Sequence, residues 1–474
     1  MSGFRLRPLL LSLSCAALPG CITFHTLPED VSKRIDEAAA PLQPHVDDDA
    51  AVRRIGEAAT RGELPAIEDC TLPPAPGCDD YVRLALLRNP RVQARVRDLQ
   101  ALGFAVPQAA ALGDPMLDFV PPTPGMLQTA AGQMQWGLGV TQSIPWPGKL
   151  AAGGVVAEHE VRVALESLEA ERQAVIAEVK RAYADLFGAH ATLQASRDME
   201  PLLRRLRADA ESRVAAGRAD WTALQRIDDE LDTVTDSCIS LELELRTATA
   251  RLDVLMDRPI DAPLPEPTGL EIEALRDDPA ALVARALAHN PQLAAMRRMI
   301  ARDLATIDLA EQQYHPDFSV GGMFNAIMDG ISPVANGKDA WNLSLGVSLP
   351  LNFDRLRAGV LQRNAATLAS VLRYRSERNA VLLALQELTA RADAGHRRAV
   401  LLRDEILPRT RRNLEAVRAQ YEAGRADFAA LVELSRRVLE LTLEERRARA
   451  ALTGDLAEIE RLTGGASETE EVKS

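Results

Sequence analysis

Residue types that carry out chemistry are present in this sequence, but they are not grouped as an active site would require. The seven histidines and ten methionines are scattered over 474 residues. His159-Glu160 lacks the second histidine of a zinc-protease helix, and the sequence has neither a nucleophile elbow nor a phosphate-binding loop. The sequence therefore predicts no enzyme, no cofactor and no resident metal.

Acidic and thiol groups in the first part of the chain allow other chemistry. Asp47-Asp48-Asp49 lacks the glycine and distal glutamate of a calcium loop, so we interpret it as a solvated turn. Cys70 and Cys78 lie around a Pro/Gly-rich stretch, which in an exported protein fits either a small disulfide or two free thiols. Cys238 falls within a helical apolar stripe and is predicted to be a core residue.

Residues 1–20 have the layout of an export signal. Arg5 and Arg7 precede an apolar stretch over residues 9–18, and small residues come just before Cys21. The ending resembles a bacterial lipoprotein signal, in which the new N-terminal cysteine carries acyl chains. We therefore expect Cys21 to be the lipid attachment site (a palmitate-bearing lipoprotein), with a plain secretory signal peptide as the alternative.

A five-residue phrase occurs twice, at residues 216–220 and, 207 positions later, at residues 423–427. Both copies read Ala-Gly-Arg-Ala-Asp, and each interrupts a long Ala/Leu-rich stretch. Glycine ends a helix at low cost because it accepts the left-handed conformation. An aspartate three residues later can accept hydrogen bonds from the first N–H groups of the next helix. Each phrase is therefore predicted to be the tip of a helical hairpin.

The tips belong to a larger duplication. Asn89-Pro90 recurs 201 positions later as Asn290-Pro291, and each pair is followed by two strand-like segments that end at a proline. The chain is therefore predicted to be two homologous halves. The predicted domains are a signal peptide (1–20), a lipidated N-terminal arm (21–78), the first repeat (79–262), a linker (263–277), the second repeat (278–465) and a disordered tail (466–474).

Each half is expected to contain a short helix, a β-hairpin and a long helical hairpin. The first short helix is expected from Asp79 to about Gly103. The long helices that follow the strands should be kinked, but not ended, by Pro201 and Pro408. Strands are expected at 115–120, 134–144, 317–327 and 340–351, and the long helices at about 150–215 and 357–422.

The return helix of the first half, residues 220–256, has the spacing of a coiled-coil seam. The second half keeps this register but breaks it at Glu445 and Asp455. These two charges are predicted either to reach solvent at the edge of the seam or to face a water-filled interior. The ten seam positions of the first half are Leu224, Ile227, Leu231, Val234, Cys238, Leu241, Leu245, Ala248, Leu252 and Leu255.

Composition limits the function classes. The formal net charge of −13 argues against a nucleic-acid partner, and the aromatic fraction of 4% fits long helices better than a mixed core. After the signal there is no run of about 18 apolar residues, so no membrane-spanning helix is expected. Four strands cannot close a membrane barrel because unpaired edges are costly in lipid, whereas three copies would supply twelve strands.

With these features in order, the chain resembles the TolC family of bacterial outer-membrane efflux channels, in its lipoprotein branch (the OprM, CusC and CzcC types). The resemblance covers about residues 79–465. It is carried by the paired Asn-Pro helix starts, the strand-end motif over residues 144–149 (Ile-Pro-Trp-Pro-Gly-Lys) and the two glycine tips. It implies a homotrimer that receives substrate from an inner-membrane efflux pump of the RND type through a periplasmic membrane-fusion adaptor.

The resemblance also implies roles for individual residues. In the family, acidic residues six and nine positions after the second tip glycine set the constriction, and these positions are Ala430 and Glu433 here. Glu433 is therefore the candidate aperture gate, while Ala430 departs from the two-acid pattern. The adaptor would dock on the hairpin tips, at Gly217, Arg218, Gly424 and Arg425.

The expected fold is mainly α, with long helical hairpins forming a coiled-coil tunnel and four transmembrane β-strands per chain in a trimeric twelve-stranded outer-membrane barrel. The expected function is passive transmembrane transport of drugs or metal cations across the periplasm and bacterial cell outer membrane, as the channel of a tripartite efflux system. The alternative is a periplasmic coiled-coil adaptor or scaffold without a pore, which would need only one hairpin.

Overall fold

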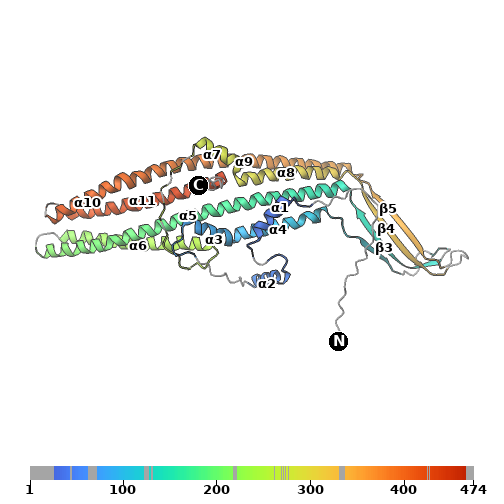
Figure 1. The fold of residues 1–474 in the computed structure, drawn as a ribbon, viewed down its shortest axis with the longest axis horizontal. Helices are drawn as coiled ribbons and strands as arrows, with labels where there is room; N and C mark the ends of the chain where they lie inside the picture. The colour runs from blue at the N-terminus through green and yellow to red at the C-terminus, as the bar shows by residue number, and fades with distance from the viewer. Residues whose placement is uncertain are drawn as a thin grey trace, which may run out of the picture. The chain divides into compact units, whose positions relative to one another are not determined.

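The computed structural model of this chain forms two compact units (Figure 1). The sheet unit contains Phe104–Glu158 and Ala305–Arg363, and the helical unit contains Pro28–Gly103, His159–Leu304 and residues 364–465. The structure describes residues 26–42, 45–61, 72–121, 128–129, 132–216, 221–260, 262–267, 269–270, 272, 274–275, 277–329, 337–423, 425 and 428–465.

The sheet unit contains one antiparallel sheet with strand order β1-β3-β4-β5. The predicted strands are confirmed as β1 (Met116–Val120), β3 (Gly132–Ile144), β4 (Asp317–Ile327) and β5 (Ala340–Ser348), and a two-residue strand, β2 (Gln128–Thr129), also pairs with β3. Strand β3 of the first repeat pairs with β4 of the second repeat along most of its length. The two repeats therefore share a single sheet.

The two faces of this sheet differ in polarity. Alternate residues of β5 (Trp341, Leu343, Leu345 and Val347) are 56–80% exposed. The strand register places Phe324 opposite Trp341, so the apolar residues of β4 lie on the same face. The opposite face carries small and polar residues such as Ser344 and Ser319. An apolar face that covers no core in the single chain, backed by a polar face, is typical of strands that contact lipid.

The helices follow the predicted repeat. The first repeat contains α3 (Cys78–Arg88), α4 (Pro90–Ala110), α5 (Pro147–Ala215) and α6 (Trp221–Leu255). The second contains α7 (Pro279–His289), α8 (Pro291–Gln312), α9 (Phe353–Val400), the π-helical segment η1 (Leu401–Ile406), α10 (Leu407–Glu422) and α11 (Phe428–Thr463). None of the helices in the described ranges carries an apolar stretch that could cross a lipid bilayer.

The single helix expected from Asp79 to about Gly103 is instead two helices, separated at Asn89. Pro90 has no N–H and pushes the preceding residue out of the helical region, and Asn89 accordingly adopts φ −56° and ψ 121°. Asn290, before Pro291, has nearly the same dihedral angles, so the second repeat is divided at the equivalent position.

Both long hairpins form as predicted, with α6 lying along α5 and α11 lying along α10 (Figure 1). In the first hairpin, Leu224, Ile227 and Val234 of α6 join a buried cluster with Leu203 and Ala210 of α5. In the second, the cluster contains Leu452, Ile459 and Leu462 of α11 with Val381, Leu385 and Leu388 of α9. Burial of these side chains, at about 25 cal/mol per Å², is the main force that holds each hairpin together.

The helices continue through both prolines, as expected, but the second repeat differs from the first. Equivalent buried residues of α5 and α9, such as Val179 and Leu385, are 206 positions apart, whereas Pro201 and Pro408 are 207 apart. The second helix therefore contains one extra residue before its proline, and η1 lies at this point. A π-helical turn takes up an extra residue without ending the helix, which accounts for η1.

The described part of the N-terminal arm contains two short helices, α1 (Glu29–Ala39) and α2 (Asp49–Thr60). Val31 and Ile35 of α1 are buried, whereas α2 has no buried residue. The Asp47-Asp48-Asp49 turn has a local structural role, because Asp48 accepts a 3.0 Å hydrogen bond from the backbone N–H of Ala51 and so caps α2.

Candidate aperture and the contacts between the hairpins

The hairpin tips are only partly described. Gly217, Arg218 and Gly424 lie outside the described residues, so the predicted docking positions there stay predictions. Arg425 is described and exposed, and its backbone N–H donates a 2.8 Å hydrogen bond to the carbonyl oxygen of Gln420. That bond satisfies one of the last carbonyl groups of α10 and leaves the side chain in solvent.

The candidate gate residue, Glu433, lies in the second turn of α11 with 65% of its side chain exposed. Its two carboxylate oxygens accept hydrogen bonds of 2.9 and 3.1 Å from one guanidinium nitrogen of Arg436. Arg436 also lies 3.7 Å from Glu440. Within one chain Glu433 is thus paired with its neighbour on the same helix, and both side chains remain accessible to solvent.

Glu230 of α6 extends this charged group across the two hairpins. Burial raises the pKa of the Glu230 carboxyl, and the nearby negative charges of Glu433 and Glu440 act in the same direction, while Arg436 opposes them. Sequence reasoning missed Glu230 because its importance depends on which helix faces which. The spacing of three residues from Glu433 to Arg436 and of four from Arg436 to Glu440 was the one sequence signal for an ion-pair network at this level.

A second contact joins the hairpins nearer to the tips. The hydroxyl group of Tyr421, on α10, donates a 2.8 Å hydrogen bond to a carboxylate oxygen of Asp209, on α5. Tyr421 is 6% exposed and belongs to the same buried cluster as Leu203 and Leu224 of the first hairpin. A cavity of about 430 Å³ adjoins this contact. Apolar packing and the hydrogen bond of Tyr421 to Asp209 therefore hold the hairpins together here.

Glu445, one of the two seam-breaking charges, does not fit either prediction made from the sequence. It neither reaches solvent nor faces an open interior in the single chain, because it is 3% exposed. Arg446 and Arg449 lie 3.4 and 3.5 Å from its carboxylate. Both guanidinium groups also lie over the ring of Phe187, 5.9 and 5.6 Å from its centroid. Burial lowers the pKa of Arg449, and Glu445 opposes that shift.

Asp455, the other seam-breaking charge, is only partly buried. Its carboxylate lies 3.6 Å from Arg391 of α9, with 21% of the side chain exposed. Burial raises the pKa of this carboxyl despite the opposing charges of Arg391 and Arg181. The environment of Asp455 therefore disfavours its ionised form, which makes it a candidate for pH dependence.

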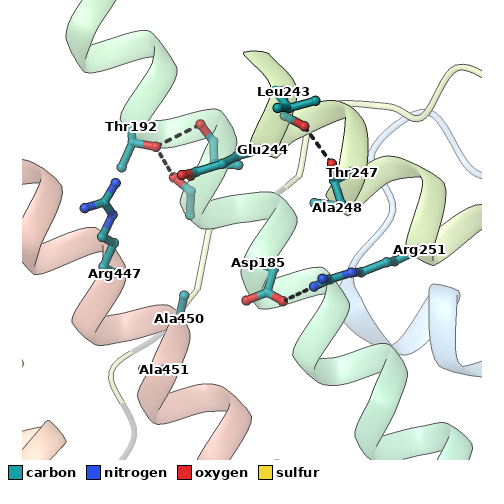
Figure 2. Close-up of a pocket in the computed structure, with 12 residues that line it drawn as sticks. Asp185, Thr192, Leu243, Glu244, Thr247, Ala248, Arg251, Arg447, Ala450 and Ala451 are labelled. Atoms are coloured by element: carbon teal, nitrogen blue, oxygen red, sulfur yellow. Dashed lines mark hydrogen bonds and ion pairs between the residues drawn. The ribbon is translucent and has the colours of Figure 1, made fainter. Parts of the chain in front are cut away.

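A cavity of about 490 Å³ lies between α5, α6 and α11 (Figure 2). Small residues, including Gly188 of α5 and Ala450 of α11, line it together with Leu243 of α6. Asp185 and Arg251 form a 3.5 Å ion pair across its edge, joining α5 to α6. The cavity lies where α11 of the second hairpin meets α5 and α6 of the first.

The structure describes only some of the cysteines for which the sequence makes predictions. Cys21 and Cys70 lie outside the described residues, so neither acylation nor the predicted disulfide is tested. Cys78 is half-buried at the start of α3, and burial raises the pKa of its thiol to about 11. Cys238, predicted to be a core residue, is only partly buried and packs against the buried cluster of the first hairpin. No group of His, Cys, Asp and Glu residues in the described ranges is arranged to hold a metal.

These features define a class of protein. One sheet shared by two repeats exposes an apolar face, and two long helical hairpins carry charged residues near their ends. Nothing in this arrangement, over the part of the chain that the structure describes, groups a nucleophile, a base and an oxyanion site, as catalysis would require. The combination is that of an outer-membrane channel with a helical extension.

The comparison with protein families identifies the chain more closely. Residues 82–257 and 282–465 match the family described as "Outer membrane efflux protein", one match for each repeat. The chain belongs to this family. It is an outer-membrane efflux channel, the outer-membrane part of a tripartite efflux system, and not an enzyme. Channels of this kind work with adaptors and inner-membrane pumps and extend into the periplasm as a helical tunnel. A comparison with curated proteins gives no match.

Solved structures have the same fold at low sequence identity. The chain is similar to CusC, with 15% identity, a TM-score of 0.69, and coverage of 82% of this chain and 92% of CusC. For VceC of Vibrio cholerae the identity is 16% and the TM-score 0.66, with coverage of 82% of this chain and 97% of VceC. MtrE of Neisseria gonorrhoeae is an outer-membrane channel solved in its open state. Its identity is 15% and its TM-score 0.64, with coverage of 82% of this chain and 89% of MtrE. The predicted fold class is thereby confirmed.

Proposed function

We propose that three copies of this chain form the channel, with their sheets closing a twelve-stranded barrel in the outer membrane. The observation that carries this proposal is the open sheet. Among the described residues, β1 pairs only with β3, and β5 pairs only with β4. Both outer edges are therefore unpaired while the apolar face is exposed, and an open edge in lipid would cost several kcal/mol for each unpaired group. Cyclic assembly pairs both edges.

Conduction through this assembly would be passive, and the hairpin ends would act as the gate. Glu433 from three chains would form an acidic ring that favours cations over anions, as charged rings in pores do. The hydrogen bond of Tyr421 to Asp209 and the charge interaction of Glu230 with Arg436 would hold the closed arrangement. An adaptor that binds the open arrangement more tightly would shift the population toward it, since only differential affinity can move such an equilibrium.

The same assembly implies particular partners and roles for each segment. A periplasmic membrane-fusion adaptor would contact the tips at Gly217, Arg218, Gly424 and Arg425, and an RND-type inner-membrane pump would supply drugs or metal cations. The repeats would act as functional units over residues 79–262 and 278–465, joined by the linker 263–277. The arm over residues 21–78 would be lipid-anchored through Cys21, with Cys70 and Cys78 as a candidate disulfide.

Mass measurement tests the assembly and the anchor together. Native mass spectrometry of the detergent-purified protein should give three times the mass of the processed chain. The denatured chain should begin at Cys21 and carry the added mass of acyl groups, and Cys21→Ser should remove that mass. A monomer in every detergent would contradict the ring, whereas an unmodified residue 21 would contradict only the lipid anchor.

Adaptor docking is tested by cross-linking from Arg425→Cys, with the exposed Asn413→Cys as the matched control.

A further inference from the structure

The second repeat leaves the sheet through a short, exposed apolar segment. Strand β5 ends at Ser348, and α9 begins at Phe353 (Figure 1). Leu349, Leu351 and Phe353 are 63%, 73% and 61% exposed. The backbone N–H groups of Leu351 and Phe353 donate hydrogen bonds of 3.0 and 3.1 Å to carbonyl oxygens two residues earlier, so the segment turns tightly. Exposed apolar side chains therefore continue beyond the end of the paired strand.

The paired strand is too short to fill the apolar band of a membrane by itself. The exposed apolar residues of β5 run from Trp341 to Val347, which spans about 20 Å at ~3.4 Å per residue. A tilt of about 40° lowers this height to roughly 16 Å, whereas the outward-facing apolar band of membrane sheets is about 25 Å tall. Close to Trp341 the chain is polar, with exposed Lys338 and Asp339. The remaining height is therefore supplied at the other end, by residues 349–353.

Two exposed arginines follow this segment in the first turns of α9. Asn352 caps the helix, because its side-chain oxygen accepts a 3.1 Å hydrogen bond from the backbone N–H of Arg355. Leu356 is buried, whereas Arg355 and Arg357 on either side of it are exposed. Within the described ranges, neither guanidinium group forms an ion pair. With two arginines and one aspartate, Asp354, these turns are net positive just beyond the apolar band.

The corresponding junction of the first repeat has its positive charge paired within the chain. Lys149, at the start of α5, lies 2.8 Å from a carboxylate oxygen of Asp317, and its side chain is 12% exposed. The same oxygen accepts a 2.9 Å hydrogen bond from the backbone N–H of Trp146. Of the described cations at the two junctions, those of α9 are therefore the ones that face solvent.

We propose that residues 349–357 bind an anionic phospholipid of the periplasmic leaflet, with its phosphate group held by Arg355 and Arg357. The acyl chains would lie against Leu351 and Phe353. This inference rests on the proposed function, because it takes the sheet to span the outer membrane with the helices on the periplasmic side.

Two observations favour a lipid as the occupant. The segment is continuous with the exposed apolar face of β5, which already has the pattern of a lipid contact. Arginine presents its N–H groups in a planar fork that matches a phosphate group. Each basic residue near a charged lipid surface contributes about a fivefold preference for anionic lipid. Because Asp354 offsets one of the two arginines, the expected net preference is about fivefold.

Native mass spectrometry of the detergent-purified protein measures this preference. The protein is mixed with equal amounts of dioleoylphosphatidylglycerol and dioleoylphosphatidylcholine, and the retained lipids are counted after collisional activation. The wild type should retain about fivefold more phosphatidylglycerol. Arg355→Gln with Arg357→Gln should retain the two lipids about equally, whereas Arg355→Lys with Arg357→Lys should keep most of the excess because the charge remains.

Two controls locate the effect and identify the ligand. Arg373→Gln with Arg375→Gln changes two exposed arginines at the same spacing, about 24 Å further along α9, and should leave the excess unchanged. Inorganic phosphate in tenfold excess over lipid should not displace phosphatidylglycerol, because free phosphate has no acyl chains to contact the apolar segment. Displacement by phosphate would reveal a site for free anions and overturn the lipid assignment.

The outcomes separate this inference from the proposed function. A trimeric mass without an excess of phosphatidylglycerol, or with an equal loss in the control pair, overturns the lipid site and leaves the ring intact. If the Arg355/Arg357 glutamine variant is monomeric where the wild type is trimeric, these arginines contact a neighbouring copy, and the inference is wrong. A monomeric mass in every variant contradicts the ring, while an excess that disappears only with Arg355 and Arg357 still supports the lipid site.

Discussion

The amide nitrogen of the Asn290 side chain donates a 2.9 Å hydrogen bond to the carbonyl oxygen of Leu462, at the end of α11. Its side-chain oxygen accepts a 2.9 Å bond from the backbone N–H of Leu293, at the start of α8. Asn89 makes the corresponding bonds to Leu255 and Arg91 in the first repeat. The duplicated Asn-Pro pair therefore caps two helices at once and fixes the end of each return helix.

Replacing Asn290 with alanine should destabilise the helical unit by about 1–3 kcal/mol, because buried backbone groups lose their partners. Asn290 is 1% exposed, so water would not replace both bonds. The measurement is chemical unfolding of the purified protein followed by circular dichroism at the helical signal. Asn413→Ala, at an exposed position of α10, is the control and should change stability by less than about 0.5 kcal/mol. Equal effects of the two substitutions would refute the capping role.

Glu445 and Glu444 are adjacent but should respond very differently to substitution. Glu445→Gln leaves Arg449, with 15% of its side chain exposed, without its buried counter-charge, and should cost about 3 kcal/mol. Glu444→Gln removes a surface pair with Arg398, with 44% and 64% of the side chains exposed, and should cost less than about 1 kcal/mol. The same unfolding measurement checks both substitutions. If Glu445→Gln lowered the stability less than Glu444→Gln does, the buried cluster would not stabilise the hairpin.

The raised pKa of Asp455 predicts a pH dependence with a defined sign. In the unfolded state the pKa of an aspartate carboxyl is about 3.9, and in the folded state the pKa of Asp455 is higher. Such a group stabilises the fold below the unfolded pKa, and this contribution is lost as the pH rises through the folded pKa. Asp455→Asn should therefore be more stable than the wild type at pH 7, with the advantage vanishing below about pH 4. Unfolding curves across this range test the prediction.

Asp198→Asn, at an exposed position of α5, is the control for this pH series. An equal pH dependence of this variant would show that the effect is not specific to the environment of Asp455. If Asp455→Asn is instead less stable than the wild type at pH 7, the ion pair of Asp455 with Arg391 outweighs the cost of burying the carboxylate, and the predicted sign is wrong.

The pairing of Glu433 with Arg436 predicts opposite effects on ion preference. Glu433→Gln should lower the permeability of cations relative to anions, because it removes a carboxylate at the aperture. Arg436→Ala should raise it, since the carboxylate is then no longer paired with its neighbour. Reversal potentials in asymmetric salt measure both changes. Arg437→Ala, on the same helix, is the comparison variant. If neither Glu433→Gln nor Arg436→Ala moves the reversal potential, the gate lies elsewhere.

The elements of this fold could be predicted from the sequence because their signals are local and repeated. The alternating strand at Trp341, the seam that begins at Leu224 and the glycine phrases each occur within a short stretch, and duplication distinguishes them from chance. The helix break at Asn89 is not predicted by the apolar spacing, which continues across it, although proline restricts the residue before it. The π-helical segment could not be predicted from a local signal. It becomes evident only when the buried residues of the two repeats are aligned and their sequence offset is compared with that of the prolines.

The contacts between hairpins could not be predicted in the same way. Glu445 has the spacing of a seam residue and the chemistry of a surface residue, and its burial depends on Arg446, Arg449 and Phe187, which lie on two different helices. The link between Tyr421 and Asp209 joins residues 212 positions apart. Such contacts depend on how the hairpins are placed, which single-sequence patterns do not encode.

The proposed function depends on the assembly of this chain into a membrane-spanning conduit, and electrical recording measures that property. Purified protein added to a planar lipid bilayer should produce discrete conductance steps. A trimeric conduit predicts steps of uniform size from trimeric fractions alone. Steps of the same size from monomeric fractions, or a trimer that inserts without conducting, would contradict it.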